Sequence, residues 1–490
     1  MPVTPFGEWK PDISDYEAST SQNILNVVPR GDGYGPFPDL AALSASLGAQ
    51  CRGAIAAYKT DGSVSIFAGT TTELFLFDNT DFTWSNVSKG GGPYSDLSSG
   101  DQWRFVQFND LVIVVQANVA PQCFNIVSSS EFDDLDGSPP QARYIDIVGR
   151  FAVLSGLLTQ ANRVQWSGLN SVNGPDSWTA GINSSDYQDL PDGGICRGVA
   201  GGETGIIFQD AAIRRMTFVP GSPVIFQIER IAQDKGLFGP YSLVRAGERI
   251  FFYSAQGFHR IDPGGYPTPI GRERVDRSFL ADLDKGSLEL FMGAADPRNT
   301  RVFWAYKSTN GQLGRFDKLL CYDWTLDRFT PIATIGQYLL QMSQPGITLE
   351  GVGAIYPDLD AMTTSLDDFS TTLTPEIAAF DANSMLAFFR GANLEASLET
   401  AEQGTDGRRI KFRGFRPVTD AATLYGSASK RETQQSPVVA GTESLINPYT
   451  GRCNFLISTR YSRAKVRIPA GTSWSYIAGI EPDIVLEGKR

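Results

Sequence analysis

Histidine and cysteine, the residues that build most catalytic triads and zinc sites, are scarce in this sequence. Its 490 residues include a single histidine, His259, and five cysteines. The cysteines are far apart and odd in number: Cys51, Cys123, Cys196, Cys321 and Cys453. A triad requires a histidine base, and a zinc site requires several ligands at short spacing. We therefore predict no catalytic histidine, no metal site and no cofactor, and we expect the thiols to stay reduced.

Carboxylate pairs and a glycine-rich segment are the other candidates for chemistry. Asp133–Asp134 and Asp367–Asp368 lie in polar stretches that are typical of loops. A glycosidase needs two acids about 5–10 Å apart across a sugar, a distance that sequence spacing does not define. The segment GVAGGETG (198–205) lacks the Lys-Ser/Thr pair of a phosphate-binding loop, so it indicates a turn. These patterns predict a protein that is not an enzyme.

The densest charge feature is the stretch STRYSRAKVRIP, residues 458–469. Side chains alternate between faces along a strand, so Arg463, Lys465 and Arg467 are expected on one face and Arg460 on the other. Such an electropositive row is a candidate contact for a neighbouring subunit or for DNA. The alternative is a solvated edge strand whose charges protect it from unwanted pairing.

Charge is unevenly distributed along the chain. The formal net charge is −12, but residues 404–490 hold 14 basic and 7 acidic residues, a net charge of +7. The other 403 residues therefore carry −19. An acidic body is a poor reader of nucleic-acid sequence, because phosphate contacts require lysine and arginine. The change of sign indicates a separate module at the C-terminus.

Short runs rich in β-branched and aromatic residues, separated by Asp-Gly and Asn-Asp turns, dominate the middle of the chain. They group into meanders of about 40–53 residues, the size of a propeller blade. The meanders begin near Gly53, Arg104, Ile145, Gly198, Gly247 and Thr300. Because radial packing of blades protects strand edges, we predict an all-β fold. Its core would be a β-propeller of six or seven four-stranded blades.

Four regions follow from these patterns. We predict an extended N-terminal arm (1–45), propeller blades (46–335), a mixed insertion or last blade (336–403) and a basic C-terminal β-module (404–490). Short helices are expected within residues 39–48 and 374–389. The sequence has no run of about 18 apolar residues and no leader-like start, so we expect no membrane span and folding in the cytoplasm.

Several segments resemble the tail hub or nozzle proteins of short-tailed bacteriophages, also known as packaged-DNA stabilisation proteins. The likeness covers most of the chain, without an invariant motif, and is weakest over residues 336–400. The segments that carry it are NVVPRGDGYGPFPDL (26–40), NRVQWSGLNSVNGPDSW (162–178), the stretch from Gly205 to Asp262, and RYSRAKVRIP (460–469).

The resemblance implies a structural virion protein that assembles into a homohexameric ring in the viral tail. Such a ring lies below the portal and adaptor, extends the DNA channel, helps to retain and eject the genome, and presents tail fibres or spikes. Genomic DNA would pass through it without sequence-specific binding. The alternative function, from another class, is a carbohydrate-binding or glycan-degrading β-propeller.

Overall fold

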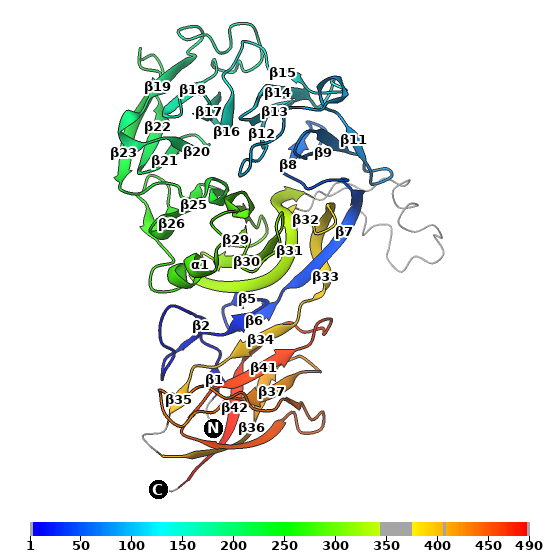
Figure 1. Cartoon of the computed structure of the whole chain (residues 1–490), viewed down its shortest axis with the longest axis vertical. Helices are drawn as coiled ribbons and strands as arrows, with labels where there is room; N and C mark the ends of the chain where they lie inside the picture. The colour runs from blue at the N-terminus through cyan, green and yellow to red at the C-terminus, as the bar shows by residue number, and fades with distance from the viewer. Residues whose placement is uncertain (1–2, 344–374, 405–407, 488–490) are drawn as a thin grey trace.

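The computed structural model describes residues 3–343, 375–404 and 408–487, which form a large and a small β-domain (Figure 1). Strands hold 52% of the residues and helices 4%, which confirms the predicted all-β class. The larger domain is a β-propeller, and the smaller one is a two-sheet β-sandwich at the end of the molecule where both chain termini lie (Figure 1). The helical elements of the described residues are α1 (Asp276–Asp282) and four 3-10 turns, η1 (Lys89–Gly91), η2 (Pro191–Gly193), η3 (Pro240–Ser242) and η4 (Leu288–Leu290).

The first five blades are four-stranded antiparallel meanders of consecutive strands. Blade one consists of β8 (Ala54–Tyr58), β9 (Val64–Gly69), β10 (Leu74–Phe77) and β11 (Trp84–Asn86). Blade two consists of β12 (Arg104–Phe108), β13 (Leu111–Gln116), β14 (Val119–Asn125) and β15 (Asp133–Asp134). Blade three consists of β16 (Ala142–Val148), β17 (Phe151–Leu157), β18 (Arg163–Trp166) and β19 (Asp186–Asp189). Blades four and five are β20 (Cys196–Ala200), β21 (Gly205–Gln209), β22 (Ala212–Phe218), β23 (Phe226–Gln233); and β24 (Val244–Ala246), β25 (Arg249–Ser254), β26 (Gly257–Ile261), β27 (Thr268–Pro269). The first five predicted opening positions each lie within three residues of the start of the first strand of their blade.

The sixth and seventh blades form one seven-stranded sheet and share a long curved strand, β31 (Arg328–Ser343). The first half of β31 pairs with β30, and its second half pairs with β32. The other strands are β28 (Met292–Ala295), β29 (Arg301–Tyr306), β30 (Phe316–Asp323), β32 (Pro375–Asp381), β33 (Met385–Asn393) and β7 (Pro38–Ser46). Strand β7 precedes the first blade in the sequence and is the outermost strand of the seventh, so it closes the ring. The described propeller therefore has seven blades.

The sixth blade begins earlier than predicted. Its first strand is β28, with the sequence MGAA, and Thr300 immediately precedes the second strand, β29. Small residues without β-branching give no strand signal, so packing in the centre of the ring, and not local propensity, makes this segment a strand. Strands with a clear signal, such as LVIVVQ in β13 and FAVLSGL in β17, are buried along nearly their whole length.

The sandwich packs a six-stranded sheet against a five-stranded sheet around a core that includes Phe412, Phe415, Val466 and Ile477. The first sheet contains β1 (Thr4–Pro5), β5 (Val27–Arg30), β6 (Gly33–Pro36), β36 (Ile410–Thr419), β39 (Cys453–Thr459) and β42 (Ile477–Leu486). The second contains β4 (Ile24–Leu25), β34 (Ala396–Glu399), β37 (Tyr425–Ala428), β38 (Ser444–Leu445) and β41 (Ala464–Ile468). Two short pairs complete the described strands, β2 (Glu8–Trp9) with β3 (Thr20–Ser21) and β35 (Gln403–Gly404) with β40 (Tyr461–Ser462).

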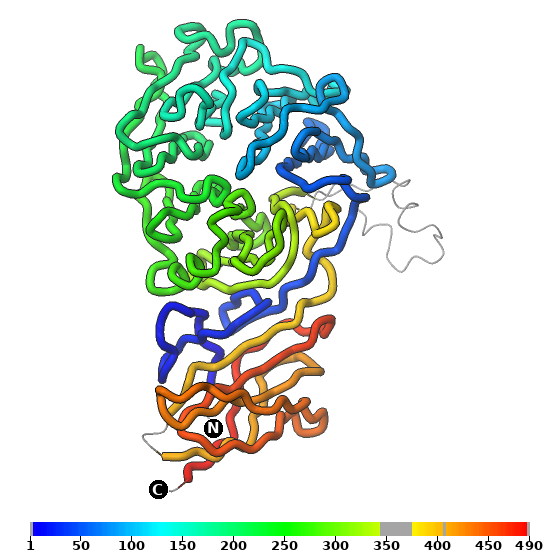
Figure 2. Tube along the Cα trace, viewed as in Figure 1, coloured from blue at the N-terminus to red at the C-terminus, as the bar shows by residue number. Residues whose placement is uncertain are grey.

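The N-terminal segment belongs to both domains and is not an appended arm. Strands β1, β4, β5 and β6 complete the sandwich, and β7 completes the propeller. The chain crosses between the domains twice, and the two crossings run side by side (Figure 2), joined by a 3.0 Å hydrogen bond from Leu394 N to Phe37 O. The boundary predicted at residue 404 divides the sandwich, because β34 precedes it. The helices predicted within 39–48 and 374–389 are wrong, since β7, β32 and β33 pair with one another there.

Candidate functional site

The predicted basic row lies on and beside β41, where Lys465 and Arg467 alternate with buried Val466. Strand β41 pairs with β34 on one side and β37 on the other, so it is an interior strand, and the edge-strand alternative is wrong. Arg467 is bound by two carboxylates, those of Glu443 at 2.6 Å and Glu395 at 2.9 Å. Hydrogen bonds from Arg467 lower the pKa of the Glu443 carboxyl. The charge of Arg467 is therefore compensated within the chain.

Arg463 binds the N-terminal segment of its own chain. Its Nε and Nη2 atoms each donate to a carboxylate oxygen of Asp15 at 2.8 Å. Glu402 lies beside this pair, with an oxygen 3.9 Å from Arg463 Nη1, and it also forms an ion pair with Arg431. Asp15 and Glu402 are buried. We call these four residues the Asp15 network; mutual pairing is what makes buried charges tolerable, because an unpaired buried charge is costly.

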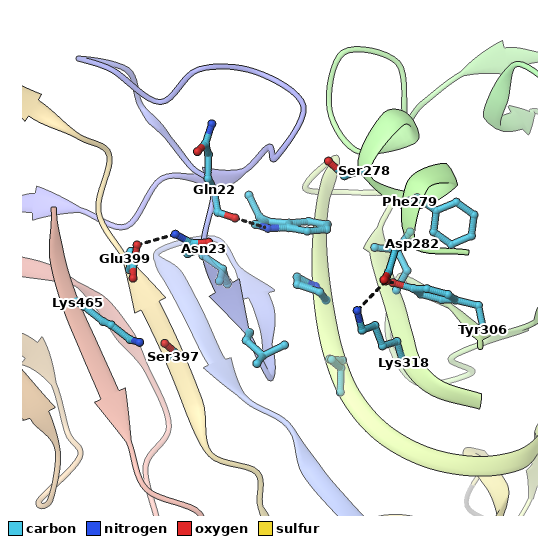
Figure 3. Close-up of a pocket in the computed structure, with 16 residues that line it drawn as sticks. Gln22, Asn23, Ser278, Phe279, Asp282, Tyr306, Lys318, Ser397, Glu399 and Lys465 are labelled. Carbon is cyan, nitrogen blue, oxygen red and sulfur yellow. Dashed lines mark hydrogen bonds and ion pairs between the residues drawn. The ribbon is translucent and has the colours of Figure 1, made fainter. Parts of the chain in front are cut away.

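Arg460 and Lys465 have different surroundings. The Nε atom of Arg460 is buried and has no hydrogen-bond partner. Lys465 extends from β41 into a cavity between the two domains (Figure 3). The four predicted residues therefore do not form one continuous basic surface. Two of them are paired inside the chain, in contacts that link sequence positions too far apart for spacing to reveal.

The cavity between the propeller and the sandwich has a volume of about 590 Å³ (Figure 3). On the propeller side, Asp282 accepts hydrogen bonds from Lys318 Nζ at 2.7 Å and from the Tyr306 hydroxyl at 3.0 Å. On the sandwich side, Asn23 Nδ2 donates to Glu399 at 2.7 Å. Apolar side chains line much of the rest: Trp9, Ile24, Leu25, Phe279, Leu320 and Ile332. No pattern in the sequence indicates this cavity, because its walls come from segments far apart in the chain.

Asn26 is the polar link between the domains. Its backbone N donates to Pro331 O at 3.0 Å, and its Oδ1 accepts from Ala333 N at 2.7 Å, so it docks on the edge of β31 like one residue of a strand. Its Nδ2 donates to Glu395 O at 2.8 Å, in the segment that leads into the sandwich. Asn26 has φ 61°, a left-handed conformation that asparagine adopts more readily than most residues. One side chain thus ties the N-terminal segment to both domains.

A second link joins the N-terminal segment to α1. The carboxylate of Asp12 accepts hydrogen bonds from the backbone N atoms of Arg277 and Ser278, both at 2.8 Å. Ser278 Oγ also donates to it at 2.6 Å. These are backbone donors that the first turn of a helix leaves without intrahelical partners. The helix therefore serves as an anchor for the segment that continues into the sandwich.

The propeller axis is closed near its middle. Tyr144 and Tyr241 lie in edge-to-face contact with ring centroids 6.2 Å apart, and both are buried. The Tyr241 hydroxyl accepts a 2.8 Å hydrogen bond from Gln102 N. A cavity of about 460 Å³ is lined in part by Tyr144, and another of about 240 Å³ is lined by residues of β8, β12, β16, β24, β28 and β31. The innermost strands of the blades therefore surround two separate axial cavities.

The histidine and the cysteines are buried, and the Asp133–Asp134 pair is bound by a lysine of the same chain. His259 is buried, contacts Gly257 O through Nδ1 at 2.9 Å, and has a pKa lowered mainly by burial. The five cysteines are buried free thiols, and burial raises the pKa of Cys123 to about 11. Asp133 and Asp134 share the ammonium of Lys89 at 2.9 and 2.7 Å, while Asp367–Asp368 lie outside the described residues.

The described part of the chain lacks two further kinds of feature. It contains no group of three or more His, Cys, Asp or Glu side chains placed to hold a metal ion. Within the same ranges, no helix has the length and apolar character needed to cross a membrane.

Comparisons with known proteins give matches in structure only. No family model matches the chain, and no curated protein matches it. The extracellular domain of the hybrid two component system BT4673 from B. thetaiotaomicron is 11% identical with a TM-score of 0.40; the match covers 82% of this chain and 47% of that one, about half its length. BamB from Moraxella catarrhalis is 10% identical with a TM-score of 0.37, covering 74% and 92%. YCF48, in a structure bound to D1 peptide, is 13% identical with a TM-score of 0.38, covering 62% and 92%.

Proposed function

We propose that this chain is a structural virion protein, a subunit of the tail hub or nozzle of a short-tailed bacteriophage, and not an enzyme. It would be made in the host cytoplasm and join a ring of six copies below the portal and adaptor, with fibres or spikes attached. The sequence segments that resemble this family support the proposal, and the propeller is the scaffold that the resemblance implies.

The observation that carries the proposal is the sharing of the N-terminal segment between the two domains. Strands β4, β5 and β6 lie in the sandwich, and β7, a few residues later, closes the propeller. Arg301 adds a 2.9 Å hydrogen bond from the propeller to Pro29 O. Because one segment contributes strands to both domains, the two domains resist rotation against each other. Such stiffness suits a load-bearing subunit of a ring, whereas a hinged pair of domains would suit closure over a substrate.

The closed propeller axis bears on where DNA would pass. The buried rings of Tyr144 and Tyr241 leave no path for a duplex along that axis. In the proposed ring, the DNA channel would therefore lie between subunits, around the symmetry axis. An acidic or mixed wall there would let DNA slide, because phosphates held by many lysines and arginines are released only at high salt.

A surface of the sandwich fits the proposed contact with a neighbouring copy. Leu445, Tyr449 and Leu456 are 53%, 96% and 65% exposed on β38, on the turn that follows it and on β39. Arg413, on the adjacent strand β36, and Arg452, just before β39, share one carboxylate, that of Asp483. Exposed apolar groups with basic neighbours match an acidic partner surface, and the body of this chain has a net charge of −19. Contacts between unlike surfaces close into rings when the rotation per subunit permits.

The test is assembly. We expect the purified protein, alone or mixed with its adaptor, to form six-membered rings in mass photometry and electron microscopy. Leu456→Asp should leave monomers with an unchanged circular dichroism spectrum, whereas Val127→Asp, at a 69% exposed propeller position, should leave rings intact. A protein that stays monomeric and does not bind the adaptor at any concentration would contradict the hub proposal.

Glycan binding is the second candidate, and the cavity between the domains is the observation that favours it. Its mixture of aromatic, carboxylate and lysine groups could bind a sugar by stacking and hydrogen bonding. A glycan array with the intact protein distinguishes the two functions: saturable binding that Asp282→Asn abolishes would favour the glycan candidate over the hub.

A further inference from the structure

The smaller axial cavity, of about 240 Å³, is lined by two arginines, which come from the inner strands of the second and fifth blades. Arg104 opens β12, and Arg245 lies on β24. The guanidinium of Arg104 lies over the ring of Tyr241, 5.7 Å from the ring centroid. Arg245 uses its Nε atom to donate to Gly247 O at 2.8 Å, which leaves its two terminal nitrogens directed elsewhere.

Neither arginine forms an ion pair with a carboxylate within 4.0 Å among the described residues, although both attract Asp146. Within the described residues, most arginines of the propeller have an acidic partner, as Arg163 has Asp189 at 2.6 Å, whereas Arg104 and Arg245 form no ion pair. Arg104 and Arg245 therefore differ from most propeller arginines in having no ion pair, and both line the same cavity.

The acid that lines the cavity is already occupied. The two carboxylate oxygens of Asp146 accept hydrogen bonds from Ile147 N at 2.8 Å and from Gly201 N at 2.7 Å. These backbone donors hold the carboxylate on its own strand wall, where it also attracts the guanidinium groups of Arg104 and Arg245. With two arginines and one aspartate, the cavity carries a net positive charge.

We propose that this cavity is a binding site for a small oxyanion, with Arg104 and Arg245 as its ligands. Guanidinium groups present planar pairs of N–H donors that match the oxygens of phosphate and carboxylate. Apart from Asp146, the rest of the lining is uncharged and comes from the inner strands of several blades, among them β28 and β31. The volume suits phosphate or a four-carbon dicarboxylate and lies below the range of larger ligands. The site is independent of the hub proposal.

Isothermal titration calorimetry with inorganic phosphate and with succinate, at constant ionic strength in chloride, tests the site on the full chain. We expect one anion per chain to bind, and Arg245→Gln to weaken binding at least tenfold. Arg245 is exposed, so this change leaves the packing intact. Arg245→Lys keeps the charge but loses the planar pair of N–H donors, so its anion affinity should lie between those of the wild type and Arg245→Gln. Binding of phosphate alone would assign a phosphate ligand, and binding of succinate alone a carboxylate ligand; both outcomes support the site.

Arg197→Gln is the matched control. Arg197 lines the other axial cavity and is paired with Asp210 at 2.6 Å. Its substitution should leave the affinity unchanged, while Arg104→Gln should lower it as Arg245→Gln does. Binding of neither anion to the wild-type chain would overturn the proposal, as would equal affinities for the wild type and the Arg104 and Arg245 variants.

Discussion

The propeller and the sandwich are both antiparallel β-structures, but they are assembled over very different distances along the chain. In the first five blades each strand pairs with the next, as Phe108 does with Leu111. In the sandwich, Thr4 pairs with Ile480 and Leu25 pairs with Ser397. Local pairs bring little loop-closure cost, whereas pairs between distant segments must offset a large one. The sandwich therefore depends on N-terminal segments that the propeller can largely do without.

Deleting residues 1–25 is the most drastic test of how far each domain depends on the N-terminal segment. This change removes β1 to β4 and the buried side chains of Phe6 and Ile24 from the sandwich core, but it leaves β7 in the propeller. We expect the sandwich to unfold and the propeller to stay folded. Limited proteolysis with mass spectrometry should show rapid cleavage after about residue 396 and a resistant propeller fragment. Deletion of residues 1–3, which precede β1, is the control and should change nothing.

The second test removes one member of the Asp15 network. Asp15→Ala leaves the largely buried Arg463 without its bidentate partner, and breaking a buried ion pair in this way costs about 3–5 kcal/mol. The loss of stability should appear in the unfolding transition of the sandwich, measured by urea denaturation. Because replacing both partners removes the uncompensated charge, Asp15→Ala combined with Arg463→Met should be more stable than Asp15→Ala alone. A double variant that is less stable would contradict a role as an ion pair.

These distances also explain what the sequence could reveal. Periodicity and turn residues placed five blades because each is complete within one stretch, with turns such as that at Asn109, where φ is 52°. The same reasoning missed the fate of residues 1–45, since nothing within them indicates pairing with residues more than 300 positions away. It found the basic row on β41 but not its partners. Asp15 and Glu443 are unremarkable as sequence, and only the fold brings them to Arg463 and Arg467.

A third test weakens the junction between the two regions. Asn26→Ala removes the hydrogen bonds of its side chain to Ala333 N and Glu395 O and places alanine at φ 61°. We expect a loss of about 1–2 kcal/mol. Asn26→Gly loses the same bonds but tolerates the backbone conformation, so it should be the milder change. If both variants unfold as the wild type does in differential scanning calorimetry, Asn26 does not couple the domains.

The smallest expected effect concerns pH at α1, where the N-terminal segment meets the propeller. Burial, together with the nearby charge of Asp12, raises the pKa of the Asp276 carboxyl to about 6. An aspartate in the unfolded chain has a pKa of about 3.9. As pH falls from 7 toward 4, the folded chain therefore takes up a proton before the unfolded chain does, and this group favours folding. That contribution is lost as pH rises through about 6.

Asp276→Asn isolates this contribution, because the amide oxygen can still accept the 3.1 Å hydrogen bond from Phe258 N without carrying a charge. The melting temperature of the variant relative to the wild type should be higher at pH 8 than at pH 5. Asp284→Asn is the matched control. The Lys307 ammonium lowers the pKa of the Asp284 carboxyl, so that group stays ionised across the range, and its variant should differ from the wild type by a constant amount. A constant difference for Asp276→Asn as well would show that its carboxylate is solvated, and that the N-terminal segment docks on α1 without a cost in charge.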